Sequence, residues 1–160
     1  MVTMCLKRIL YSAILVACFA VSCKKKSNST NTNVNTNCVY TNATQQQLNY
    51  TILSGSGQFF PLNVVGGFIY INGYGYQQKG ILVYRLTQSQ FLAYDRNCTH
   101  DGCTNAQALI KVQTGNTSCK DTICGSVYSI FDGSIQTGPA AVPLFQYHTS
   151  WDGNQLRIYN

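Results

Sequence analysis

Glutamate is absent from this chain of 160 residues, and charged residues of all kinds make up only 10% of it. The acidic side chains are five aspartates scattered along the sequence. We find no paired carboxylates, no serine near a histidine and an aspartate, and no phosphate-binding glycine loop, so we expect no catalytic activity of its own. Helix formers such as lysine are few beside 11 tyrosines and 13 glycines, so the composition favours an all-β domain.

The net charge of +6 is carried mainly by the start of the chain. Lys7, Arg8 and the run Lys24–Lys26 supply five of the eleven basic residues. From Cys38 onward six basic residues stand against the five aspartates, which is a balance of +1. A nearly neutral domain does not predict a nucleic-acid-binding surface.

Residues 1–22 resemble a bacterial lipoprotein signal peptide, after which a cysteine becomes the lipidated first residue. Lys7 and Arg8 precede an apolar run from Ile9 to Val21 that is too short to span a membrane as a helix. Two cysteines compete for the lipid. Cys18 follows the usual residue types more closely, but Cys23 gives the fuller apolar run and leaves no apolar segment in water after cleavage. We therefore expect lipidation at Cys23.

Residues 23–37 follow as the lipidated cysteine and a polar tether. Val34 is the one apolar residue in 24–37, so this segment buries nothing and we expect it to be disordered. The sequence therefore predicts one domain, residues 38–160, held by a lipid to a membrane of the bacterial cell envelope, at the outer membrane or facing the periplasm.

Short apolar or alternating segments, separated by turn residues, fill the predicted domain. Pairs such as Asn72-Gly73, Asp132-Gly133 and Asp152-Gly153 mark the turns. Many short strands at close spacing predict a β-sandwich or a small barrel. The expected strands are Leu48–Leu53, Gln58–Val65, Phe68–Asn72, Gly80–Leu86, Gln90–Tyr94, Ala108–Val112, Val127–Phe131, Leu144–Thr149 and Gln155–Tyr159.

Two short runs hold most of the soft metal ligands of this domain. We call Cys98–Cys103 (CTHDGC) the first box and Cys119–Ser126 (CKDTICGS) the second box. Thiols and an imidazole on two neighbouring loops are typical of a metal centre or of a pair of disulfides.

The boxes and the segments after them resemble a Rieske iron–sulfur domain. The first box resembles its Cys-x-His-x-Gly-Cys box, Gly125-Ser126-Val127-Tyr128 its Gly-Ser-x-Tyr, and Gly138-Pro139-Ala140 the loop that shields the cluster. The resemblance implies an all-β Rieske-like sandwich with a small cluster-binding subdomain at about 98–140. It further implies a [2Fe-2S] cluster that exchanges one electron with a partner protein. Ser126 and Tyr128 match hydroxyls that tune the cluster, and Pro139 belongs to the shielding loop.

The second box departs from the family pattern. Counted back from Gly125, the histidine position holds Cys124 and the cysteine position holds Asp121, whereas the first box keeps Cys98 and His100. Half of the implied ligand set is therefore changed in kind. One interpretation keeps a [2Fe-2S] cluster on Cys98, His100, Cys124 and either Cys119 or Asp121.

Two other interpretations stay open. The first is a clusterless binding or structural lipoprotein, because spaced cysteines pair in an oxidising compartment and no twin-arginine signal indicates export of a folded, cluster-loaded domain. Its two disulfides would join Cys98, Cys103, Cys119 and Cys124, in any of three pairings, and Cys38 would be left over. The second is a zinc site formed by Cys98, His100, Cys119 and Cys124.

Overall fold

The computed structural model describes residues 47–160. The predicted signal peptide, lipidation site and tether lie outside the described residues, and so does Cys38. The described part consists of ten strands and two short 3-10 helices joined by turns. No helix within it is long and apolar enough to cross a membrane. The expected all-β fold is confirmed.

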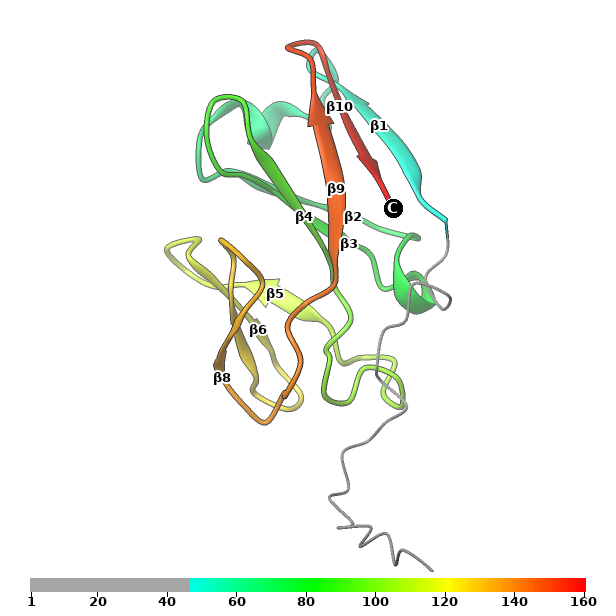
Figure 1. The fold of residues 1–160 in the computed structure, drawn as a ribbon, viewed down its shortest axis with the longest axis vertical. Helices are drawn as coiled ribbons and strands as arrows, with labels where there is room; N and C mark the ends of the chain where they lie inside the picture. Colours follow the sequence, from blue (N-terminus) through cyan, green and yellow to red (C-terminus); the bar gives the residue numbers. More distant parts are fainter. Residues whose placement is uncertain (1–46) are drawn as a thin grey trace, which may run out of the picture. The chain divides into compact units, whose positions relative to one another are not determined.

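One antiparallel sheet has six strands in the order β1-β10-β9-β4-β3-β2 (Figure 1). Its strands are β1 (Asn49–Leu53), β2 (Phe68–Ile71), β3 (Ile81–Arg85), β4 (Phe91–Asp95), β9 (Gln146–Trp151) and β10 (Gln155–Tyr159). Strand β1 pairs with β10, with Asn49 opposite Tyr159 and Leu53 opposite Gln155. The start and the end of the described chain are therefore joined in one sheet.

A second antiparallel sheet has four strands in the order β5-β6-β7-β8. Its strands are β5 (Ile110–Val112), β6 (Ser118–Asp121), β7 (Val127–Ser129) and β8 (Ile135–Thr137). This sheet is inserted between β4 and β9. The first box lies between β4 and β5, and the second box runs from within β6 to the start of β7, so the two boxes meet at one end of the small sheet.

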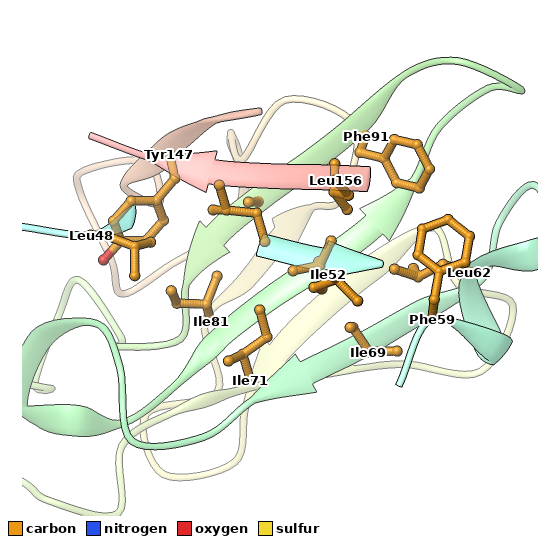
Figure 2. Packing of buried hydrophobic residues seen from close by; sticks show 13 residues of the cluster. Leu48, Ile52, Phe59, Leu62, Ile69, Ile71, Ile81, Phe91, Tyr147 and Leu156 are labelled. Atoms are coloured by element: carbon orange, nitrogen blue, oxygen red, sulfur yellow. The ribbon is translucent and has the colours of Figure 1, made fainter. Parts of the chain in front are cut away.

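Two hydrophobic clusters pack on opposite faces of β3 and β4. Alternation along β3 sends Ile81 and Val83 into the first cluster, shown in Figure 2, and Leu82 and Tyr84 into the second. All five residues of β3 are buried as a result. The second cluster joins the two sheets, since it combines Leu82, Tyr84 and Tyr94 of the larger sheet with Ile110, Cys119, Tyr128, Ile130, Ala140 and Leu144.

Most of the expected strands are present, with two kinds of exception. The segment Gln58–Val65, expected as a strand, contains the 3-10 helix η2 (Phe60–Asn63), because Pro61 lacks the N–H that a sheet ladder needs. A second 3-10 helix, η3 (Tyr76–Gln78), precedes β3. Strands β6 and β8 were not expected, and β6 matters most because it carries part of the second box.

Candidate metal centre

A buried lysine holds the first box in shape from its centre. Lys79, just before β3, is 8% exposed. Its Nζ donates to the side-chain oxygen of Asn97 at 2.7 Å and to the carbonyl oxygens of Gly102, of Asn105 at 2.7 Å and of Ala108 at 3.2 Å. Burial lowers the pKa of Lys79, and the nearby anionic groups oppose that effect. One ammonium therefore closes the loop from residue 97 to residue 108.

Asp95, the last residue of β4, fixes the start of that loop. Its carboxylate is fully buried and accepts hydrogen bonds from the N–H of Tyr76 at 2.7 Å, the N–H of Asn97 at 2.8 Å and the hydroxyl of Tyr147 at 2.8 Å. Burial raises the pKa of Asp95, and the three donors lower it to a smaller extent. The carboxylate thus ties the large sheet to the chain that leads into the first box.

The first box is a tight turn around the sulfur of Cys98. The N–H of Gly102 donates to the carbonyl of Cys98 at 3.0 Å, and a Cβ at Gly102 would overlap that carbonyl and the Asn97 side chain. This close approach directs the backbone N–H groups of His100 and Asp101 at the sulfur. Cys98 is fully buried, and burial raises the pKa of its thiol while the surrounding donors lower it.

The second box consists of the end of β6 and the turn into β7. Along β6 the buried residues are Cys119 and Asp121, which point to the same side of the strand. Gly125, at a φ of 80°, donates its N–H to the Asp121 carbonyl at 3.1 Å and reverses the chain. The Oδ1 atom of Asp121 accepts the N–H of Ile123 at 2.5 Å and that of Cys124 at 3.2 Å. These bonds place Cys124 beside Asp121.

Four donor side chains, two from each box, converge where the loops meet. The sulfur atoms of Cys98 and Cys124 are 3.3 Å apart. With one carboxylate oxygen each from Asp101 and Asp121, they form a group whose ligand atoms all lie within 4.8 Å of one another. Asp101 Oδ1 and Asp121 Oδ2 are buried and have no hydrogen-bond partner in the described part of the chain. Buried polar atoms are normally paired, so these two oxygens are suited to binding a cation.

Hydroxyl groups lie against both sulfurs. The thiol of Cys124 donates to Ser126 Oγ at 3.0 Å, and the same oxygen accepts the N–H of Ala140 at 2.9 Å. The Tyr128 hydroxyl lies 3.5 Å from the sulfur of Cys98. Backbone N–H groups also donate to both sulfurs, from Ser126 to Cys124 at 3.4 Å and from His100 and Asp101 to Cys98. Such donors stabilise the thiolate form, which is the form that binds metal ions.

Asp101 is the donor that the sequence interpretation missed. His100, expected as a ligand, is half-buried and is not a member of this donor group among the described residues. A spacing signal for Asp101 is present in the sequence. Two residues separate Cys98 from Asp101 in the first box, and two separate Asp121 from Cys124 in the second, so the boxes share one spacing in opposite order.

Two other residues expected at the site lie away from the donor atoms. Cys119 points into the second hydrophobic cluster, with its sulfur 3.8 Å from the carbonyl oxygen of Tyr128. Burial raises the pKa of Cys119 to about 12. Pro139 is exposed, and its neighbour Ala140 is the residue of that loop that bonds to Ser126.

The four box cysteines do not pair with one another in this structure. Cys98, Cys119 and Cys124 carry free thiols, whereas Cys103 is disulfide-bonded. The two disulfides expected within the boxes are replaced by one bond at Cys103 and by a close, unbonded approach of Cys98 to Cys124.

No protein-family model and no curated protein sequence match this chain. Its fold, however, is similar to that of the plasma membrane Rieske protein PetC3 from the cyanobacterium Synechocystis PCC 6803. The TM-score is 0.50 at 20% identity, over 68% of this chain and 99% of that chain. The domain has a Rieske-like fold. A chain in the complex of reduced oxygenase and oxidized ferredoxin in carbazole 1,9a-dioxygenase is also similar, with a TM-score of 0.48 at 18% identity over 71% of this chain and 94% of that one.

The ligand set of a Rieske cluster does not fit this site. That set places two imidazoles on one iron, and the whole chain has two histidines. His100 lies outside the donor group, and His148 is exposed in β9, where its ring centroid is 5.4 Å from that of Tyr159. This site therefore offers thiols and carboxylates, whereas a Rieske cluster is held by thiols and imidazoles.

Proposed function

We propose that this protein binds a metal between the two boxes of its Rieske-like domain, at the bacterial cell envelope. A lipid on Cys23 and the polar tether attach the domain to the membrane, which is its first partner. The sulfur atoms of Cys98 and Cys124 are the principal ligands. A redox-active metal at this place would supply one-electron transfer, the role that the Rieske resemblance implies, to a protein partner.

One observation carries this proposal. Two thiols lie 3.3 Å apart, and next to them are two buried carboxylate oxygens that have no partner in the described part of the chain. Burying an anionic oxygen without a partner is costly, so a fold that keeps two of them at one place is best explained by a cation. The backbone N–H groups that donate to the two sulfurs, from Ser126 to Cys124 and from His100 and Asp101 to Cys98, add support, since they stabilise sulfur in the anionic form.

The surrounding residues hold these ligands in place. Lys79 and Asp95 fix the first box by hydrogen bonds, and the turn at Gly125 fixes the second. Cys98 is fully buried, so the centre would be shielded from water on that side. Cys124 is half-buried, so a partner protein would approach the centre from the side of Cys124.

The test is metal analysis of the full chain, exported with its own signal, purified anaerobically and recorded by ultraviolet–visible spectroscopy with iron, sulfide and zinc determination. We expect bound metal in the wild type and its loss in Cys98→Ser and Cys124→Ser. Cys119→Ala is the matched control, because it removes a buried thiol that points into the hydrophobic cluster. A wild-type protein that contains no metal and takes none up after reconstitution would refute the proposal.

The same distance favours a second candidate function, a structural one. Sulfur atoms 3.3 Å apart need to approach by little more than about 1 Å to reach a disulfide bond length. In an oxidising compartment a Cys98–Cys124 bond would fasten the two boxes and stabilise the fold by about 2–4 kcal/mol. Thiol counting in denaturant separates the two candidates. Metal binding requires both thiols to be free, whereas the disulfide removes both from the count.

A further inference from the structure

We propose that the centre holds a single divalent cation of the zinc class, bound by Cys98, Asp101, Asp121 and Cys124, and not a two-iron cluster. This inference rests on the metal binding proposed above and specifies its ligands and its ion. Because zinc has no redox chemistry, a centre of this kind would not transfer electrons. It assigns a ligand role to Asp101 and takes that role away from His100.

The first argument is size. An ion with metal–sulfur bonds of about 2.3 Å and metal–oxygen bonds of about 2.0–2.2 Å holds tetrahedral ligand atoms roughly 3.3–3.8 Å apart. The sulfur atoms of Cys98 and Cys124 are 3.3 Å apart, and all four ligand atoms lie within 4.8 Å of one another. A two-iron cluster puts two metals and two sulfides between its ligand pairs, which separates those pairs further. The space between the boxes therefore suits one ion.

The second argument is the state of the two carboxylates. Asp121 is fully buried, and Oδ1 is already held by the N–H groups of Ile123 and Cys124, so Oδ2 has a fixed direction. That Oδ2 atom has no partner among the described residues, and neither has Asp101 Oδ1. Both residues belong to the group of converging ligand atoms. Each box thus contributes one sulfur and one carboxylate that has an unpaired oxygen, which gives a four-coordinate S₂O₂ set.

The third argument is charge. Binding releases one proton from each thiol to solvent, so a divalent ion with two thiolates and two carboxylates has a net charge of −2. The Lys79 ammonium lies close enough for Asp101, Asp121 and Cys98 to act on it electrostatically. A buried cation next to the anionic complex offsets part of that excess charge. Four-coordinate tetrahedral sites with sulfur ligands are typical of structural zinc.

The experiment is a titration of the metal-free full chain with Co²⁺ under argon, followed by displacement with Zn²⁺. No reductant is added, so that the disulfide at Cys103 stays intact. We expect one Co²⁺ per chain, with the sulfur-to-cobalt charge-transfer absorption and the intense visible bands of a tetrahedral site. Asp101→Asn and Asp121→Asn should each weaken binding at least tenfold. The amide introduced by Asp121→Asn keeps the Oδ1 acceptor that the turn needs, so this variant should fold.

His100→Asn is the matched control, and it should bind Co²⁺ as the wild type does. Unchanged affinity in both aspartate variants, or a loss in His100→Asn, would overturn the inference. Two irons and two sulfides per chain would also overturn it, although the proposed function of metal binding would then stand. A wild-type protein that binds neither cobalt, zinc nor iron would refute both the proposed function and this inference.

Discussion

Replacing Lys79 with methionine should destabilise the domain and open the first box. The substitution keeps an unbranched side chain that is one atom shorter, but removes the ammonium that bonds to the carbonyls of Gly102, Asn105 and Ala108 and to the Asn97 side chain. Each hydrogen bond from a charged donor contributes about 1.5–3 kcal/mol. Loss of the three bonds to carbonyls would therefore cost up to about 9 kcal/mol. Removing a buried charge returns part of that cost. The lowered pKa of Lys79 shows that this burial is unfavourable.

We therefore expect a net loss of about 3–5 kcal/mol in the free energy of unfolding, the range seen when one partner of a buried charged network is removed. Urea denaturation of the full chain measures this loss, and hydrogen exchange followed by mass spectrometry should show faster exchange in peptides covering residues 97–108. Lys111→Met is the matched control, because Lys111 is exposed in β5 and its loss should change stability by less than about 0.5 kcal/mol. Equal stability of the two variants, with protection of residues 97–108 retained in both, would refute the account of the first box.

Three further results should follow. Tyr147→Phe removes a donor from the buried Asp95 carboxylate and should destabilise the fold by about 1.5–3 kcal/mol at neutral pH. Because burial raises the pKa of Asp95, this destabilisation should be present above that pKa and shrink as acid neutralises the carboxyl. Urea denaturation curves between about pH 7 and pH 4 would measure the change. Gly102→Ala should disrupt the first box, since the added Cβ has no space. It should abolish metal binding while the circular dichroism spectrum of the domain changes little. Among the three free thiols of residues 47–160 in the metal-free protein, iodoacetamide should modify half-buried Cys124 first, as mass spectrometry would detect. Rapid labelling of the fully buried Cys98 and Cys119 would show that the boxes are open.

The sequence predicted the larger sheet well because its strands follow simple rules. Runs such as Ile81–Arg85 are apolar or alternating and end at turn residues. Both features can be recognised in the sequence without knowledge of tertiary contacts. Strand β6 was missed because Ser118–Asp121 was interpreted as part of a ligand loop. Its alternation was nevertheless present, with Cys119 and Asp121 on the buried side. Cys119 consequently lies in the hydrophobic cluster, although its residue type suggested a ligand.

The sequence predicted the two cysteines of the candidate site but not Asp101, because ligands were inferred by matching family positions. Cys98, Cys124 and the hydroxyls of Ser126 and Tyr128 could be aligned with family positions, and the structure brings them together. Asp101 could not be found in this way, because the family position next to it is a histidine and carboxylates are common on loops. Its importance follows from burial and from a missing partner, which only the folded arrangement reveals.

X-ray absorption at the zinc edge tests the central claim most directly. The sample is the full chain, isolated anaerobically without reductant and loaded with one equivalent of zinc. The account predicts two sulfur and two oxygen neighbours around each zinc, no second metal nearby, and loss of one sulfur in Cys124→Ser. Zinc surrounded by oxygen or nitrogen alone, or a protein that retains none, would contradict it.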